Sequence, residues 1–291
     1  MKDILRLYSS FGNELDTARM YCDGNTEEVL CELQVQKDFK LATKAFPFKP
    51  GMHSPELLEK QFMESLDALG SKCVDIFYLH APDHATPFED TLKKVDEFHK
   101  LGYFKELGLS NYAAWNVMEI YKICEAKNYV LPTVYQGRYS VLTRDVEPEL
   151  FPCLRKLNIR FYAYNPLCGG LLAGKLKMQD EPDGRFATET IQGKRYRERY
   201  WNTEYFAALE EYKAICDRHG IRYVEAAHRW IMNHSQLNGT FGDAVIIGAS
   251  SFEQAKENFE DCQKGTLPEE MVATFDKLWK NVSSVCPRYA R

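Results

Sequence analysis

The stretch VDIFYLH, residues 74–80, decides the fold class. All but one of its first six side chains are apolar or aromatic, so both faces of the segment are suited to burial. A short run of this kind indicates a strand covered on both sides, which is typical of parallel sheets. A histidine, His80, follows the apolar run directly. The stretch therefore predicts a buried parallel strand with a titratable side chain at its carboxyl end.

Segments of the same kind recur along the chain, and an amphipathic run follows most of them. The other strand candidates are NELDTA (13–18), KLATKA (40–45), FKELGLSN (104–111), PTVYQGRY (132–139), IRFYAYNP (159–166) and DAVIIGAS (243–250). The helical runs are TEEVLCELQVQ, SPELLEKQFMESLDAL, FEDTLKKVDEFHKLG, WNVMEIYKICEAK and EPELFPCLRKL, and the first three start at the cap or first-turn signals Thr26, Ser54-Pro55 and Thr86-Pro87. A strand alternating with a helix about every 25–36 residues predicts βαβ units and a parallel sheet.

Two parallel architectures are considered. A doubly wound dinucleotide-binding sheet needs G-x-G-x-x-G in its first turn, and Gly169, Gly170 and Gly174 do not have that spacing. A (β/α)8 TIM barrel needs eight strands, and seven are found. We therefore predict a single barrel domain over residues 1–291, shortened at its N-terminus and lacking the first strand, with ILRLYSSFG as the tail of a first helix. The charged and glycine-rich stretch 167–202 is predicted to be a large functional loop.

Composition limits the class of function. A net charge of -5 and a pI near 5.9 argue against a general nucleic-acid binder, so RYRERYW (195–201) is interpreted as a solvated loop or subunit contact. Nine scattered cysteines predict reduced thiols. No apolar run approaches the ~20 residues of a membrane span, and the chain start does not resemble a signal peptide. Cytoplasm is the expected location.

Polar side chains stand at or just after the strand ends: Asp16, Lys44, His80, Ser110-Asn111, Gln136, Tyr164-Asn165 and Ser250-Ser251. In a barrel of this type the carboxyl ends of the strands meet on one face, where sites are built. Each residue alone has an ordinary structural explanation, such as a helix cap or a solvated lysine. Together with Tyr21, just after the first candidate strand, they predict a shared site.

The residue types fit the reduction of a carbonyl group. A phenol is a poor acid near neutrality, and a neighbouring cation lowers its pKa towards a useful range. Lys44 can supply that cation, Asp16 can keep Lys44 charged, and the His80 imidazole can orient a carbonyl oxygen. No metal-ligand spacing and no G-x-S-x-G motif is present. The attacking group is therefore expected to be hydride from a reduced nicotinamide.

Seven motifs in order make the chain similar to the aldo-keto reductases, in particular their aflatoxin-aldehyde and succinic-semialdehyde reductase branch. They are ELDTARMY, ATKA, VDIFYLHAPDH, LGLSNY, PTVYQGRYS, FYAYNPLCGGLLAGK and IIGASSFEQAKEN, and the resemblance runs from about residue 6 to the end. It implies NADPH-dependent reduction of small aldehydes and ketones, including dicarbonyls and semialdehydes. It also implies a homodimer.

The resemblance also implies roles for individual residues. Tyr21 becomes the general acid, with Asp16 and Lys44 tuning it and His80 orienting the carbonyl. Asn111 with Ser110 and Gln136 would bind the carboxamide, and Tyr164 would stack on the nicotinamide ring. Other implied NADPH contacts are Asp16, Asn165, Pro166, Leu167, Gly169, Gly170, Leu171, Gly174, Lys175, Arg185, Ser250, Ser251, Gln254 and Asn258. Arg291 resembles a clamp for a substrate carboxylate.

Some alternatives stay open. Many relatives in other branches of the family have arginine at the position of Gln254, and a neighbouring cation such as Arg185 or Lys256 could substitute for it at the 2′-phosphate. An alternative role for Gln136 is to bind backbone groups at a strand end. Ser250 and Ser251 could instead be helix caps, and Arg291 could instead be part of a solvated terminus. At the level of function, a non-catalytic nucleotide-binding or regulatory protein of the same fold is the main alternative, because the first strand is missing.

Overall fold

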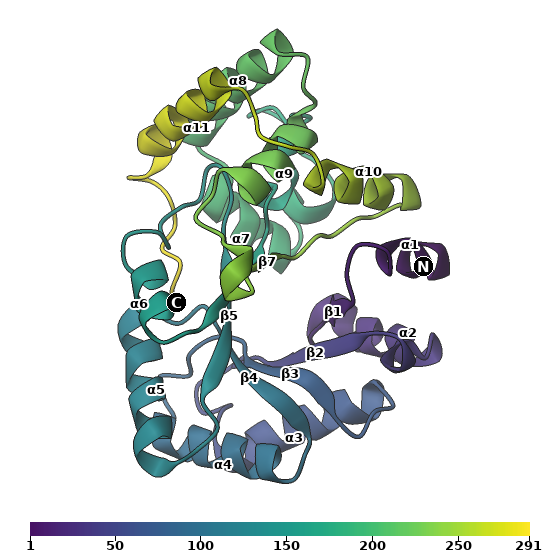
Figure 1. Ribbon diagram of the computed structural model, residues 1–291, viewed down its shortest axis with the longest axis vertical. Helices are drawn as coiled ribbons and strands as arrows, with labels where there is room; N and C mark the ends of the chain where they lie inside the picture. Colours follow the sequence, from purple (N-terminus) through teal and green to yellow (C-terminus); the bar gives the residue numbers. More distant parts are fainter. The chain divides into compact units, whose positions relative to one another are not determined.

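The computed structural model describes residues 1–291 and contains one seven-stranded sheet (Figure 1). The strands follow one another in sequence order, and each pairing of known register is parallel. They are β1 (Glu14–Asp16), β2 (Lys40–Ala45), β3 (Val74–Leu79), β4 (Phe104–Ser110), β5 (Pro132–Arg138), β6 (Arg160–Tyr164) and β7 (Ala244–Val245). This order and direction are those of a (β/α)8 barrel lacking one strand, as the sequence predicts.

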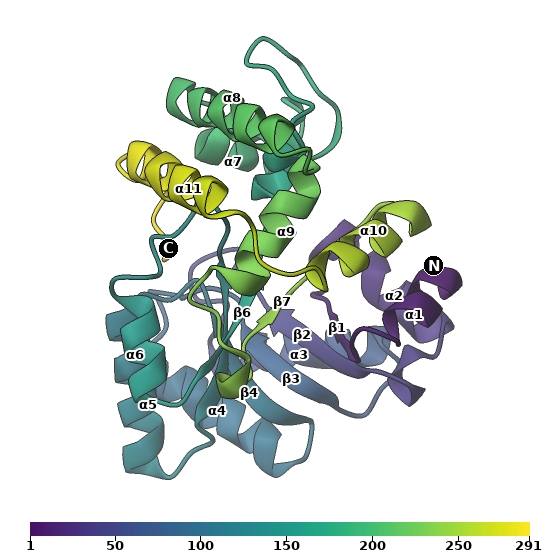
Figure 2. The same cartoon turned by 45° about the horizontal axis from the view of Figure 1, so that its top comes forward.

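The chain divides into two compact units, the first of which comprises residues 1–136, 149–161 and 290–291. Its helices are α1 (Lys2–Tyr8), α2 (Asn25–Glu32), α3 (Pro55–Ala68), α4 (Phe88–Lys100), α5 (Ala114–Lys127) and α6 (Leu150–Lys156). Both views place α3 and α4 on the same side of β2, β3 and β4 (Figures 1 and 2).

An aromatic cluster joins the strands of the first unit to their helices. Phe77 of β3 stacks on Phe62 of α3, with ring centroids 4.0 Å apart. Phe98 of α4 and Phe104 of β4 pack against the same pair. All four side chains are buried. Rings of this size bury enough apolar surface to dominate the energetics of a core, and here they fix the position of β3.

The second unit comprises residues 137–148 and 162–289. Its helices are α7 (Ile191–Tyr200), α8 (Thr203–Arg218), α9 (Tyr223–Asn233), α10 (Phe252–Cys262) and α11 (Glu269–Val282). Helices α8 and α11 lie side by side in both views (Figures 1 and 2), and Tyr212 stacks on Phe275 between them at 4.9 Å. None of the helices combines the length and apolar character needed to span a bilayer.

The main expectations about secondary structure are confirmed. Each of the seven predicted strands contains an observed strand, and α1 (Lys2–Tyr8) overlaps the segment 4–12 predicted as the tail of a first helix. The single-domain assignment stays a prediction. The stretch 167–202 is more ordered than a simple loop, because it contains short 3-10 helices, Cys168–Ala173 and Gly184–Phe186, and the ten-residue helix α7.

The helix start predicted at Thr26 is confirmed, with Thr26 as a first-turn residue and not as the N-cap. Thr26 lies inside the first turn of α2, which begins at Asn25 after the N-cap Gly24. Its hydroxyl donates a hydrogen bond to the Tyr21 carbonyl oxygen at 3.2 Å, so it ties the helix back to the preceding turn.

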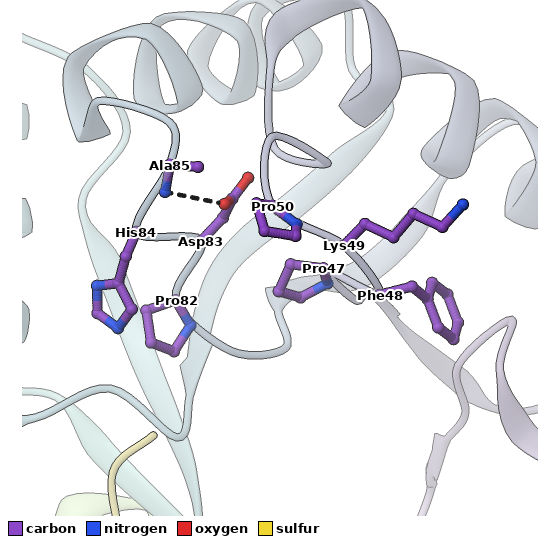
Figure 3. Close-up of a pocket in the computed structure, with 8 residues that line it drawn as sticks. All are labelled: Pro47, Phe48, Lys49, Pro50, Pro82, Asp83, His84 and Ala85. Carbon is purple, nitrogen blue, oxygen red and sulfur yellow. Dashed lines mark hydrogen bonds between the residues drawn. The ribbon is translucent and has the colours of Figure 1, made fainter.

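Asp83 joins the loop after β2 to the loop after β3. One carboxylate oxygen accepts hydrogen bonds from the backbone nitrogens of Gly51 (3.0 Å) and Ala85 (3.1 Å), and the other accepts from the His53 nitrogen and the Thr86 hydroxyl, both at 2.8 Å. Figure 3 shows Asp83 on segment 82–85, facing Pro50 of segment 47–50, and both segments line a pocket. Charge-assisted bonds of this number hold both loops in place.

The first prediction concerns acid stability. Burial lowers the pKa of His53, a buried residue of the loop after β2, to about 4, and burial lowers the pKa of His228 in α9 to about 4. The unfolded chain, with histidine pKa values near 6.5, takes up protons first as the pH falls. Each histidine should therefore cost about 3 kcal/mol of unfolding free energy between pH 6.5 and 4.

Urea unfolding measured across this range tests the sign and size of the effect. His53→Gln should remove one share of the pH dependence and His228→Gln a second share. The double variant should keep the remaining share that comes from buried His80, whose pKa is also lowered. A His53→Gln slope equal to that of the unchanged protein would contradict the assignment.

Candidate active site

Three neighbouring strands of the first unit present the predicted site residues at their carboxyl ends. Asp16 is the last residue of β1, Lys44 is the fifth residue of β2, and His80 follows β3. The register aligns Asp16 with Ala42 and Lys44 with Tyr78. Parallel pairing thus brings residues that are far apart in the chain to one edge of the sheet.

Lys44 and Asp16 form a short ion pair. The Lys44 Nζ atom lies 2.6 Å from Asp16 Oδ2 and also donates to the Thr17 carbonyl oxygen at 2.8 Å. The Lys44 side chain is fully buried, and this burial lowers its pKa, while Asp16 and Glu27 oppose the shift. The carboxylate therefore holds the proton on a lysine that burial alone would tend to neutralise.

Tyr21 and His80 stand next to this pair. Lys44 Nζ lies 5.0 Å from the centroid of the Tyr21 ring. The His80 ring is 6.0 Å from the same ring, edge to face at 83°. All four residues predicted to be catalytic therefore lie together in the first unit. A cation so close to a phenol stabilises the phenolate form relative to the phenol.

His80 is electrically neutral at ordinary pH. Burial is the main cause that lowers its pKa well below 6.5, and the positive charges of Lys44 and Arg291 act in the same direction. The ring also packs edge to face against Phe46 at 5.2 Å. A neutral imidazole donates one hydrogen bond and accepts one, so this side chain is suited to orienting a polar atom.

Asn111, Ser110 and Gln136 lie in the first unit as well. Asn111 has a left-handed backbone with φ of 63°, and its Nδ2 donates to the His80 carbonyl oxygen at 2.8 Å and to Ser110 Oγ at 2.9 Å. Gln136 Nε2 donates to Asp16 Oδ1 at 2.8 Å. Gln136 thus supports the ion pair, a contact that neither the carboxamide role nor the backbone role anticipates.

Arg291 is fixed at the edge of the site. Its backbone nitrogen donates to the Asn111 carbonyl oxygen at 3.1 Å, and its own carbonyl oxygen lies 3.3 Å from His84 Nε2. Its guanidinium carbon is 5.7 Å from the centroid of the Phe46 ring. The residue is therefore held by its main chain, while its cation faces the aromatic residues beside His80.

The second unit carries the remaining predicted residues. After Tyr164 the chain turns at Asn165, with φ of 64°, whose Oδ1 accepts from the Gly169 nitrogen at 2.6 Å. Gly169 and Gly170 have φ of 73° and 106°. A Cβ on Gly169 would stand 2.5 Å from the Tyr196 ring, so only glycine fits there. The turn belongs to the segment containing Pro166, Leu167, Leu171, Gly174 and Lys175.

The predicted adenosine-end residues form a second group in this unit. Ser251 is the N-cap of α10, and its Oγ accepts a hydrogen bond from the Gln254 backbone nitrogen at 3.2 Å. The alternative role of Ser251 as a helix cap is therefore confirmed. Ser250 Oγ donates to the Gln254 side chain at 2.8 Å, and Asn258 Nδ2 donates to the Gly248 carbonyl oxygen at 3.2 Å. Arg185 approaches the same segment, because a Cβ built on Gly248 would lie 3.9 Å from its Nη2.

Sequence reasoning missed several residues around the catalytic group. Phe46 packs on His80, and the Thr17 carbonyl oxygen accepts a hydrogen bond from Lys44. The fully buried Glu27 accepts a hydrogen bond at 2.5 Å from the hydroxyl of Thr43, the residue before Lys44 in the chain. Glu27 carries a signal, since it is an acidic residue inside an apolar helix face. No local pattern marks Phe46 or Thr17.

Comparison with known proteins gives a consistent result. The model of the aldo/keto reductase family matches residues 1–280. The chain belongs to the aldo-keto reductase family. It is 46% identical over 292 residues to mouse aflatoxin B1 aldehyde reductase member 2, covering 96% of this chain and 79% of that protein. The human protein of the same name is 45% identical over 291 residues, covering 96% and 81%.

A fungal relative spans nearly the full length of both proteins. An aldo-keto reductase of Pseudocercospora fijiensis is 44% identical over 286 residues, covering 95% of this chain and 96% of its own. As a member of the aldo-keto reductases, the chain is an oxidoreductase of aldehydes and ketones that uses a nicotinamide cofactor.

The second prediction tests the ion pair. Asp16→Asn leaves the Lys44 cation buried beside an amide, and it should lower the unfolding free energy by about 3 kcal/mol. Lys44→Met in the same chain removes the buried charge and should restore most of that loss. Urea unfolding of the two single variants and the double variant gives the coupling energy.

A matched surface pair provides the control. Lys105 and Asp75 lie 2.7 Å apart, but the Lys105 side chain is largely exposed. Lys105→Met should cost less than about 1 kcal/mol. Equal costs for Asp16→Asn and Lys105→Met would mean that the Lys44 charge is not buried as described.

Proposed function

We propose that this aldo-keto reductase reduces small aldehydes and ketones to alcohols with NADPH, and that Tyr21 is the general acid. The observation that carries the proposal is the buried Lys44 cation, which is paired with Asp16 and lies 5.0 Å from the Tyr21 ring. A phenol at this position can give up its proton at a lower pH than an isolated tyrosine.

The proton moves from the Tyr21 hydroxyl to the carbonyl oxygen of the substrate. Lys44 stabilises the phenolate that remains, and Asp16 keeps Lys44 charged in spite of its burial. Gln136 holds the second oxygen of Asp16, so the carboxylate cannot turn away from the lysine. The three supporting residues therefore act through the acidity and position of one hydroxyl group.

His80 supplies orientation in this scheme. Because its pKa is lowered, it stays neutral and donates a hydrogen bond to the carbonyl oxygen without competing as an acid. Phe46 packs against the ring and limits its rotation. The carbonyl carbon is then presented in one direction.

The second unit has features that fit NADPH. Left-handed glycines at 169 and 170 let backbone groups approach a pyrophosphate closely, and the N-terminus of the eleven-residue helix α10 suits a phosphate. Bound there, the cofactor supplies the hydride that the protein side chains lack. Arg185, near Gly248, is the proposed partner of the 2′-phosphate, since Gln254 is uncharged. Asn111 and Ser110 would hold the carboxamide.

The proposed substrates are dicarbonyl compounds and semialdehydes, including those with a carboxylate. Arg291 supports this class, because its main chain is fixed and its cation lies beside Phe46 and near enough to His80 to lower that residue's pKa. Two relatives are named for aflatoxin B1 aldehyde, and a small aldehyde remains the proposal for this chain. A homodimer in the cytoplasm is proposed as the working state.

A second candidate function follows from the strand count. The sheet has seven strands, one fewer than a complete (β/α)8 barrel. The alternative is therefore a protein of the same fold that binds NADPH without turning over substrate. Fluorescence titration with NADPH, followed by addition of succinic semialdehyde or 2-carboxybenzaldehyde, separates the two. Binding with no NADPH oxidation supports the alternative, and steady oxidation removes it.

The third prediction concerns Tyr21→Phe. Removal of the hydroxyl should lower kcat by about three orders of magnitude, because the proton donor is lost, while the Kd for NADPH stays nearly unchanged. Stopped-flow or steady-state absorbance at the nicotinamide band measures the first quantity and fluorescence titration the second. An unchanged kcat would exclude Tyr21 as the acid.

The fourth prediction concerns Arg291→Gln. The KM for succinic semialdehyde should rise at least about tenfold, because a bidentate contact to the carboxylate is lost. An uncharged aldehyde of similar length should keep its KM. Equal effects on both substrates would argue against a carboxylate contact and leave a general packing role.

A further inference from the structure

The turn that carries Tyr21 has an unusual backbone. Cys22, Asp23 and Gly24 are three consecutive residues in the left-handed region, with φ of 50°, 54° and 94°. Only glycine visits this region freely, and a non-glycine residue there costs about 1 kcal/mol or more. Such a turn persists only when its surroundings hold it.

The Arg19 guanidinium supplies the closest support. Its Nη1 donates to the Gly24 carbonyl oxygen at 2.6 Å, across the turn. The group lies flat against Gly24, since a Cβ there would stand 2.8 Å from Arg19 Cζ and 2.8 Å from Nη1. Both ends of the turn are therefore joined by a single side chain that starts two residues before Tyr21.

Two carboxylates of α2 fix the guanidinium in turn. Nη2 lies 2.9 Å from Glu28 Oε1, and Nη1 lies 3.8 Å from Oε2 of Glu27. Glu27 is fully buried, and it is tied to β2 through the Thr43 hydroxyl, next to Lys44 in the chain. The position of Arg19 is thereby linked to the strand that carries the catalytic lysine.

Arg19 and Lys44 also line one cavity of about 320 Å³ together with Met20 and Phe46. The guanidinium thus lies between the Tyr21 turn and the space beside the lysine. Its side chain is about one-third exposed, so it is reachable from solvent.

We propose that Arg19 is a positioning residue for Tyr21, which acts by closing the left-handed turn 22–24 and so directs the phenol towards Lys44 and His80. The inference rests on the proposed role of Tyr21. Arg19 touches neither substrate nor cofactor in this assignment. It acts through the turn, and a misplacement of the hydroxyl by about 1 Å is enough to cost about 100-fold in rate.

The test uses Arg19→Ala in the full chain. The kcat for aldehyde reduction should fall about 10- to 100-fold, while the Kd for NADPH stays the same. Added guanidinium chloride at sub-denaturing concentration should restore part of kcat, because it can refill the space, and sodium chloride at equal ionic strength should not. A merely structural arginine would show no such rescue.

Gly24→Ala approaches the same contact from the other side. The new methyl group would displace the guanidinium, so kcat should fall similarly, but guanidinium chloride should give no rescue. Gly102→Ala is the matched control: its φ of 77° carries similar strain, and a Cβ there meets nothing within 4 Å. This control should lose stability and keep kcat.

Arg160→Ala controls for the loss of an arginine ion pair. Arg160 holds Glu106 at 2.6 Å and 3.0 Å, at the amino ends of the strands of the first unit. It should keep kcat and show no response to guanidinium.

The outcomes separate the two proposals. A wild-type kcat in Arg19→Ala, or a loss without rescue that Arg160→Ala reproduces, overturns the positioning role. If Arg19→Ala does not fold, the test uses Arg19→Lys, which retains the charge. This variant must show an intermediate kcat with the wild-type Kd for NADPH, and a wild-type kcat in it overturns the positioning role. An unchanged protein that oxidises no NADPH overturns the proposed function instead.

Discussion

The proposed catalytic group depends on a charge that is difficult to keep. Lys44 is fully buried, and an isolated ammonium group in such a place would tend to lose its proton. Asp16 at 2.6 Å prevents this, and Gln136 and the Thr17 carbonyl oxygen complete the surroundings. The carboxyl ends of three strands, β1, β2 and β5, supply the lysine and the groups that surround it. The site is therefore a property of the sheet and not of any single segment.

His80 and Tyr21 face the same lysine cation. Burial is the main cause that keeps His80 neutral, and the Lys44 cation, whose Nζ lies 5.0 Å from the centroid of the Tyr21 ring, acts in the same direction. His80 is thus a neutral hydrogen-bond partner, and Tyr21 is the proposed proton donor. The loops that surround the pair are fixed by Asp83, whose four hydrogen bonds make the site rim rigid before any ligand arrives.

Much of the fold and of the candidate site was predictable, because both have local signals. The strand 74–79 is apolar on both faces, and the parallel architecture follows from such strands alternating with helical runs. The polar side chains at or just after the strand ends are then readable, which gave Asp16, Lys44 and His80. Helix α7 escaped prediction because IQGKRYRERY is polar nearly all round and lacks the apolar stripe by which surface helices are recognised. Thr26 could be placed at a helix start but not assigned to the cap or to the first turn, because the left-handed turn before it is what sets the start of α2 at Asn25.

The sequence by itself determined the parallel strand–helix order, the residue types at the strand ends and, through its motifs, the family. Periodicity and residue chemistry are local, so they survive without coordinates. Only the tertiary structure decided that Gln136 binds Asp16, that Phe46 packs on His80 and that the Arg19 guanidinium covers Gly24. These contacts depend on strand register, on left-handed backbone angles and on side-chain directions. Register and side-chain directions arise from packing between segments that are distant in the chain. The left-handed angles belong to a turn whose own residues do not favour that conformation.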